Sequence, residues 1–106
     1  MARPYSEQFI LGLNHANPRR IGIKLAKVCV KAHFPIIYIA DTFNVTRMSI
    51  HSWFRGGAVR DKNNTRIEIF IDLVEEGLAN GSLPALNAPH AKTYLESEIK
   101  PKLDAV

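Results

Sequence analysis

The segment Phe43–Gly57, with the sequence FNVTRMSIHSWFRGG, combines a turn, a helix start and a helix end in a short stretch. Asn44 tolerates the left-handed backbone conformation that ends one helix and reverses the chain. Thr46 can cap a second helix with its hydroxyl, and the glycine pair at the end of the segment can terminate it. The segment therefore predicts a helix over residues 47–55 that directly follows another helix.

The predicted helix 47–55 has two chemically different faces when its residues are placed about 100° apart. One face carries the large apolar side chains Ile50, Trp53 and Phe54, which we expect in the core. The opposite face is polar and cationic apart from one methionine, contains no carboxylate, and consists of Met48, His51, Ser52 and Arg55, with Arg47 at its flank. A face of this chemistry suits a groove lined with hydrogen-bond acceptors and phosphates.

Two more helices are predicted upstream of this segment. Asn17 followed by Pro18 predicts a helix start, and apolar residues at helical spacing continue that helix to His33. Its cations recur on a separate stripe: Arg20, Lys24, Lys27 and Lys31. Pro35 can open a second, short helix that runs to about Thr42. The run FPIIYIA also suits a strand by its β-branched content, but the turn and cap that follow it favour a helix.

Downstream, the sequence GGAVRDKNNTR (residues 56–66) is too short and too polar to form the paired strands of a wing. Thr65 and Glu68 form a capping-box pattern, which predicts a core-facing helix from that point with acids on its outer side. The loop before it carries polar and basic residues that are suited to contacts with a nucleic-acid backbone, Arg60, Lys62, Asn63 and Asn64.

The last part of the chain is predicted to be a linker followed by a short helix. Gly, Ser, Pro and Asn in ANGSLPALNAP (residues 79–89) indicate a turn or linker. The sequence HAKTYLESEIKPKL (residues 90–103) is amphipathic, and its helix can either pack back on the domain or join two chains. Near the start, SEQFILGL (residues 6–13) is typical of a short helix or an arm.

Composition limits the classes of protein that this chain can represent. With 106 residues, 46% of them apolar, we expect one domain with one modest core. No run is long and apolar enough to span a membrane and no secretion signal is present, so we expect a cytoplasmic protein without a membrane role. Cys29 is the only cysteine and falls among apolar helix positions, and no zinc motif is present, so neither a disulfide nor a metal site is predicted.

The charge is distributed unevenly along the sequence. The net charge is +4 overall, but residues 1–66 contain eleven basic and three acidic residues, a net charge of +8. Residues 67–106 contain three basic and seven acidic residues, a net charge of −4. A basic first part with an acidic second part favours a polyanion as the partner of the first part.

The stretch IIYIADTFNVTRMSIHSWFR (residues 36–55) resembles the helix-turn-helix of the Cro/C1-type, lambda-repressor-like DNA-binding domains. It has Ala40 where the two helices must approach closely, Val45 just after the turn, Ile50 in the middle of the second helix and Trp53 three residues later. The downstream WFRGG and RIEIFIDLV also resemble that family, so that the likeness covers residues 18–79. Two positions depart from the family pattern: Asn44 replaces the usual glycine, and Ile36 replaces a glutamine that braces a phosphate.

The resemblance implies a double-stranded DNA-binding protein and assigns roles to individual residues. The base-reading positions fall on Thr46, Arg47, Met48 and Ser52. The backbone set combines family positions with the basic and polar residues described above and consists of His51, Arg55, Arg20, Lys24, Lys27, Lys31, Tyr38, Arg60, Lys62, Asn63 and Asn64.

We therefore expect an all-α, compact helical bundle that contains a helix-turn-helix, has no wing, and carries a C-terminal helical extension. The expected parts are an N-terminal arm or short helix (1–17), the DNA-binding domain (18–79), and a linker with a short helix (80–106). We expect a nucleoid-associated, homodimeric transcription regulator of bacterial or phage type that inserts residues 47–55 into the major groove. No catalytic constellation is present, so we expect neither an enzyme nor a cofactor.

Two alternatives remain from the sequence. The helix-turn-helix can serve a component of phage DNA packaging or recombination, in which the C-terminal segment builds a ring or anchors a partner. The domain can also be a protein-binding adaptor that acts on host machinery.

Overall fold

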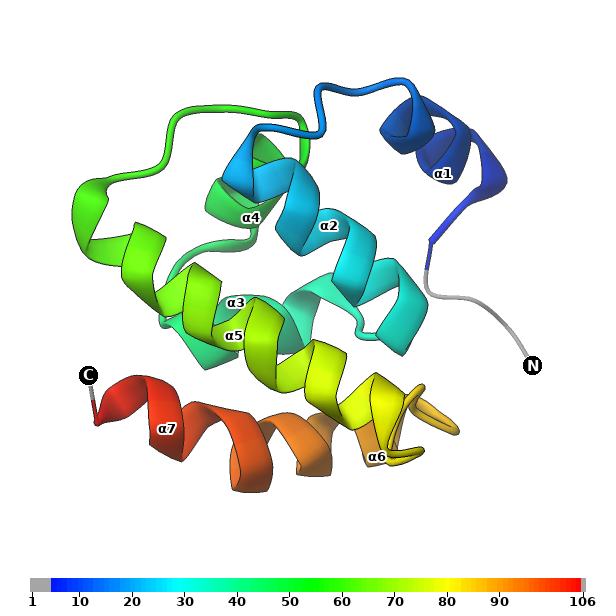
Figure 1. The fold of residues 1–106 in the computed structure, drawn as a ribbon, viewed down its shortest axis with the longest axis vertical. Coiled ribbons are helices and arrows are strands. Elements are labelled where there is room, and N and C mark those ends of the chain that lie inside the picture. The colour runs from blue at the N-terminus through cyan, green and yellow to red at the C-terminus, as the bar shows by residue number, and fades with distance from the viewer. Residues whose placement is uncertain (1–4, 106) are drawn as a thin grey trace.

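The computed structural model describes residues 5–105, which form helices joined by short turns (Figure 1). In chain order these are α1 (Glu7–Asn14), α2 (Ile21–Ala32), α3 (Ile36–Phe43), α4 (Arg47–Phe54), α5 (Asp61–Ala79), α6 (Ala88–Tyr94), the π-helical turn η1 (Leu95–Ile99) and α7 (Lys100–Asp104). We call α6, η1 and α7 together the C-terminal helix. No strand occurs within residues 5–105, so the predicted all-α fold is confirmed and no wing follows α4 in this part of the chain.

The N-terminal segment is a short helix held against the core. Residues 1–4 of the predicted arm lie outside the described residues. Ser6 caps α1, since its hydroxyl oxygen accepts a hydrogen bond of 3.1 Å from the Phe9 N–H. The buried Tyr5 hydroxyl donates to the Phe34 carbonyl, and the Tyr5 and Phe9 rings both lie beside Phe54 of α4. Burial raises the pKa of the Tyr5 phenol well above its ordinary value, with Cys29 as a smaller cause, so Tyr5 acts as a neutral core residue.

Helix α2 begins later than the sequence predicted. The Asn17 side chain accepts a hydrogen bond of 3.0 Å from the Arg19 N–H, two residues on, and so closes a turn instead of capping a helix. The helix begins at Ile21 after Arg20, which provides no side-chain cap. Its end agrees with the prediction, because His33 adopts the left-handed conformation with φ of 60°.

The predicted helix-turn-helix is present. Helix α3 ends at Asn44, which has the expected left-handed backbone with φ of 56°. Thr46 caps α4, because its hydroxyl oxygen accepts a hydrogen bond of 3.1 Å from the Ser49 N–H. Gly56, with φ of 87°, follows the end of α4. The alternative of a strand in the run FPIIYIA is wrong, since α3 covers most of it.

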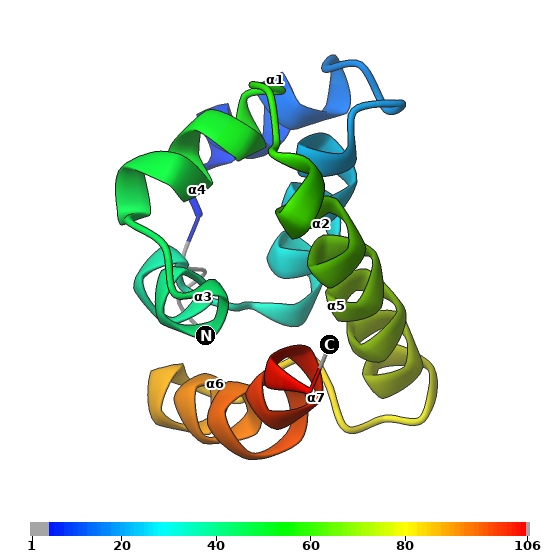
Figure 2. The same ribbon diagram turned by 90° about the vertical axis from the view of Figure 1, so that its left-hand side faces the viewer.

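Helix α4 lies directly on α2 at a glycine. A Cβ atom at Gly22 would overlap the backbone carbonyl of Trp53, so only glycine permits the observed distance between the two helices. The Trp53 ring meets the Phe43 ring edge-on with centroids 5.8 Å apart, and the Phe43 ring lies 5.0 Å from that of Phe70. These contacts fix α4 against α2 and α3, and Phe43 connects them to α5, which lies on the opposite side of the molecule from α4 (Figure 2).

Helix α5 begins at Asp61 instead of at Thr65, so the predicted capping box is wrong. Thr65 and Glu68 are both exposed within the helix, where a Thr and a Glu three residues apart have no capping role. Asp61 lies in the first turn, where a carboxylate interacts favourably with the helix dipole. As a consequence Lys62, Asn63 and Asn64 belong to a helix and not to a loop.

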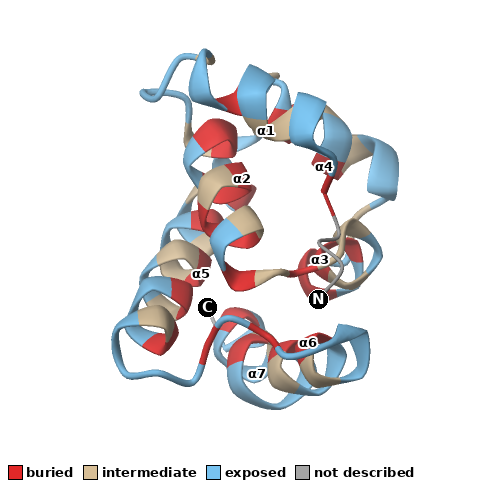
Figure 3. Ribbon diagram, turned by 90° about the vertical axis from the view of Figure 1, so that its right-hand side faces the viewer, coloured by how far each residue is buried: buried red, intermediate tan, exposed pale blue. Residues whose placement is uncertain are grey.

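The C-terminal helix packs back on the domain. It contacts α3 and α5 through Ala91, Leu95, Ile99 and Leu103, which are buried in the same core as the rest of the chain (Figure 3). A spacing of four residues would rotate an apolar stripe by about 40° at each step in a regular α-helix. The π-helical turn η1 contains one more residue per turn than an α-helix, so it compensates for this rotation and keeps the buried residues on one side. It directly precedes the turn that holds Pro101, which has no N–H to donate to the preceding turn.

Two further contacts join the extension to the helix-turn-helix domain. Arg66 of α5 donates to the Phe43 carbonyl at 3.3 Å and forms a salt bridge of 3.4 Å with Asp104 of α7. The Ala85 N–H in the linker donates to the Ala32 carbonyl of α2 at 2.9 Å. Residues 80–105 therefore share one core with residues 18–79, and both parts are expected to unfold together.

The glycine contact predicts opposite effects for two glycine-to-alanine substitutions. Gly22→Ala should destabilise the fold by about 1–3 kcal/mol, because the new methyl group must push α4 away from α2. Gly12→Ala is the matched control, since a Cβ there meets nothing within 4 Å and alanine should stabilise α1 by about 0.5–1 kcal/mol. Thermal melts measure both effects, and equal melting temperatures for the two variants would contradict the close packing.

The packing of the C-terminal helix predicts a stability role for its inner side. Leu95→Ala should lower the free energy of unfolding by about 2–5 kcal/mol, because the Leu95 side chain is only 1% exposed. Glu96→Ala, at the exposed neighbouring position, should change it by about 0.5 kcal/mol or less. Urea titrations measure both variants, and an unchanged midpoint for Leu95→Ala would mean that the C-terminal helix is not part of the core.

Candidate nucleic-acid interface

Helix α4 presents a free polar and cationic surface to solvent. Ile50, Trp53 and Phe54 are buried as predicted. On the other side, Met48 is 75% exposed, and Arg47, His51 and Arg55 are exposed with it. We call these four residues, Arg47, Met48, His51 and Arg55, the α4 ridge. The only salt bridge within residues 5–105 joins Arg66 to Asp104, so the cations of the ridge have no acidic partner in the described chain.

Two of the predicted base-reading residues lie beside the ridge and not on it. The Thr46 hydroxyl serves the α4 cap and is also 3.1 Å from the Ser49 hydroxyl. Ser52 is half-buried, and a Cβ on Gly57 would overlap its hydroxyl oxygen, so Gly57 covers part of this side chain. Thr46 and Ser52 therefore face the space between α4 and α5, whereas Arg47 and Met48 point into solvent.

An open groove separates the Thr46–Ser52 side of α4 from the start of α5. We call it the α4–α5 groove; it holds about 430 Å³ of accessible space, and its polar and basic lining residues are Thr46, Ser49, Ser52, Arg60, Lys62 and Asn63. Asn63 is only 7% exposed. The sequence interpretation did not include Ser49, which the helical period places on the same side of α4 as Ser52.

The electrostatics of the α4–α5 groove favour an anion. The backbone N–H groups at the start of an α-helix lack intrahelical acceptors and carry the positive end of the helix dipole. No side chain caps this end of α5. The groove adds two cations, three hydroxyl groups and the Asn63 amide to this helix end, whose first turn also holds one carboxylate, Asp61, and a site with this excess of donors suits a phosphate oxygen.

The predicted cation stripe of α2 is divided by the structure. The Arg20 side chain lies over Gly56, with its Cγ 3.7 Å from the position that a Cβ on Gly56 would occupy. Arg20 thus lies at the end of α4, near Arg55. The lysines of the stripe are different, because they project roughly 140–180° around α2 from Gly22, where α4 packs.

Lys24, Lys27 and Lys31 are therefore on the side of α2 that faces away from α4, which lies behind α2 in Figure 1. The structure does not bring these three lysines together with the α4 ridge. These three lysines therefore lie outside the candidate interface around the α4 ridge.

The remaining predicted backbone residues lie elsewhere. Tyr38 lines a separate groove of about 270 Å³ between α3 and the C-terminal helix, together with Lys92 and Lys100. Asn64 is half-buried in the first turn of α5 and does not line the α4–α5 groove. Neither residue adjoins the α4 ridge.

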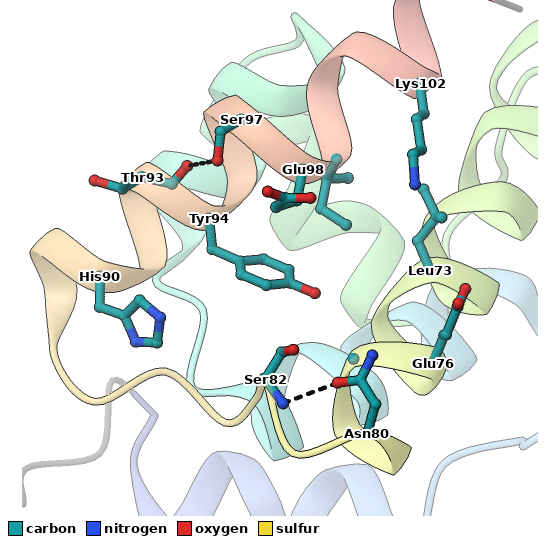
Figure 4. Close-up of a pocket in the computed structure, with 12 residues that line it drawn as sticks. Leu73, Glu76, Asn80, Ser82, His90, Thr93, Tyr94, Ser97, Glu98 and Lys102 are labelled. Atoms are coloured by element: carbon teal, nitrogen blue, oxygen red, sulfur yellow. Dashed lines mark hydrogen bonds between the residues drawn. The ribbon is translucent and has the colours of Figure 1, made fainter.

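A larger cavity of about 570 Å³ lies between α5 and the C-terminal helix (Figure 4). The Tyr94 side chain points into it, and the carboxylates Glu76 and Glu98 also line it. Burial, followed by Glu98 and Glu76, raises the pKa of the Tyr94 phenol. Because carboxylates repel phosphate, Glu76 and Glu98 make this cavity less suited to a nucleic-acid backbone than the α4–α5 groove.

Within residues 5–105, no group of three or more His, Cys, Asp or Glu side chains is placed to hold a metal ion. No described helix has both the length and the apolar character needed to cross a membrane. Cys29 is fully buried, and burial raises the pKa of its thiol.

No protein-family model matches the chain, and no match was found among curated proteins or solved structures. The likeness of residues 18–79 to Cro/C1-type domains therefore depends on the sequence alone, and membership of that family stays a prediction.

The observed starts of α4 and α5 predict different changes in stability when Thr46 and Thr65 are replaced by alanine. Thr46→Ala should cost about 0.5–2 kcal/mol of stability, because it removes the cap of α4. Thr65→Ala should leave stability unchanged or raise it slightly, because alanine has the higher helix propensity at an exposed interior position. Denaturant titrations measure both, and a loss for Thr65→Ala similar to that of Thr46→Ala would place the start of α5 at Thr65 after all.

Proposed function

We propose that this chain is a sequence-specific, double-stranded DNA-binding transcription regulator of bacterial or phage type that inserts α4 into the major groove. The observation that supports this proposal most directly is the α4 ridge. It is exposed, contains two arginines and a histidine, and lacks any carboxylate, while the opposite side of the same helix is fixed in the core.

The size and chemistry of α4 fit a major groove. An α-helix with its side chains is about 10–12 Å in diameter, and the major groove of B-DNA is about 12 Å wide, so it admits a helix such as α4. Arg47 and Arg55 can each bind guanine through two hydrogen bonds or clamp a phosphate. A ridge that only solvated the protein would be expected to mix both signs of charge.

The surroundings of the ridge offer phosphate contacts on two sides. The α4–α5 groove lies along one edge, where Arg60, Lys62 and Asn63 can hold one DNA strand. Arg20 lies at the end of α4 beside Gly56, where it can reach the backbone at a different point. Contacts at both edges would fix the register of α4 on the base pairs.

Selection of bound sequences from a random pool of DNA duplexes is the test of this proposal. A regulator should enrich one sequence, and a homodimer should enrich two half-sites centred about 10–10.5 base pairs apart or a multiple of that spacing. Absence of binding even at low salt would refute the proposal and favour the protein-binding adaptor. Light-scattering masses well above a dimer would instead favour a packaging or recombination component.

We expect two double substitutions that remove the same amount of charge to affect DNA binding differently. Arg47→Ala with Arg55→Ala should weaken binding to the selected duplex by about 1–3 kcal/mol per lost base contact. It should also reduce the salt slope by about 0.9 for each phosphate contact that is lost. Lys24→Ala with Lys27→Ala removes the same charge from the far side of α2 and should change both quantities much less.

Fluorescence anisotropy at several salt concentrations measures the affinity and the slope of both variants. Equal losses in the two double variants would mean that net charge and not the α4 ridge governs binding.

A further inference from the structure

The proposed function leaves one feature of the α4 ridge unexplained, which is the exposure of Met48. Four large apolar side chains are exposed in the described chain, and Met48 has the largest exposed fraction, 75%, against 70% for Leu86, 60% for Leu11 and 49% for Ile37. Met48 does not pack against the core cluster. The simple explanation that it covers apolar surface of its own domain therefore does not apply.

We propose that Met48 reads the 5-methyl group of a thymine in the major groove, which makes it a determinant of sequence specificity. This inference rests on the proposed function and names one chemical group in its target.

The position of Met48 on α4 supports this assignment. At about 100° per residue, Met48 projects roughly opposite the buried side chains Ile50, Trp53 and Phe54. It is therefore central on the exposed face, where a helix in the major groove comes closest to the base edges. Residues at the two flanks are nearer to the sugar-phosphate backbone, where an apolar side chain has no suitable partner.

The chemistry of the groove leaves one partner for an apolar side chain at this position. The major-groove edges of the four base pairs present hydrogen-bond donors and acceptors, and their only apolar group is the thymine 5-methyl. Methionine is unbranched and flexible, so its side chain can adapt to the position of that methyl group. Burial of one methyl-sized group contributes about 0.8 kcal/mol, which corresponds to about a fourfold change in affinity.

The test replaces single thymines by deoxyuridine in the selected duplex. This change removes the 5-methyl group and keeps base pairing and the other major-groove atoms. The wild-type protein should lose about fourfold in affinity at one thymine in each half-site. Met48→Gln keeps a similar side-chain length but removes the apolar character, so this variant should bind the thymine and deoxyuridine duplexes equally at that position.

Leu11→Gln is the matched control, because it also replaces an exposed apolar residue but lies on α1. It should retain the wild-type sensitivity to deoxyuridine. Thermal melts of both variants should match the wild type, since neither side chain is buried.

The outcomes separate this inference from the function on which it rests. A selected site without any deoxyuridine-sensitive thymine, or a sensitivity that persists in Met48→Gln, would overturn the thymine contact while sequence-specific DNA binding stands. A protein that selects no sequence at all would refute the proposed function and the thymine contact together.

Discussion

The contact of α4 with α2 at Gly22 determines where the candidate interface points. The Trp53 carbonyl lies where a side chain at Gly22 would stand, so the two helices approach more closely than other residues permit. Trp53 then meets Phe43 of α3, and Phe43 meets Phe70 of α5. With its inner side held by α2 and α3, α4 cannot rotate without breaking these contacts. The outward direction of the α4 ridge is thus a consequence of core packing.

The sequence predicted best those features that depend on a few neighbouring residues. Asn44 and Thr46 lie between α3 and α4 as predicted, because a left-handed turn and a helix cap are set by local hydrogen bonds. The predicted starts of α2 and α5 were wrong, because both helices begin after an arginine that provides no side-chain cap, so the pattern of capping residues does not mark them. Asn17 bonds to Arg19 and closes a turn, and Thr65 lies inside a helix that begins at Asp61. The burial of Asn63 depends on how the start of α5 is placed relative to the rest of the fold, and no local sequence pattern specifies that placement.

The same distinction applies to the candidate site. The helical period correctly predicted which α4 side chains are buried, because it concerns directions within one helix. It could not place the cations of α2 relative to α4. Arg20 reaches the end of α4, whereas Lys24 and its neighbours on the stripe face away, because α4 packs on the Gly22 side. A glycine inside a helix costs about 1 kcal/mol relative to alanine, so Gly22 itself was a signal of close packing that the sequence interpretation did not use.

The distribution of charge in space also differs from its distribution along the sequence. Of the basic residues before Ile67, Arg66 is held by the Phe43 carbonyl and Asp104, and the three lysines of α2 face away from α4. The cations on or beside the proposed interface are Arg20, Arg47, Arg55, Arg60 and Lys62.

This set is smaller than the 6–10 phosphate contacts that give DNA-binding proteins a strongly salt-dependent affinity. If some of these arginines contact bases, fewer remain for phosphates. Two chains on adjacent half-sites would double the set and bring it into that range. A homodimer is for this reason the arrangement in which the proposed interface would bind DNA tightly, even though the net charge of one chain is modest.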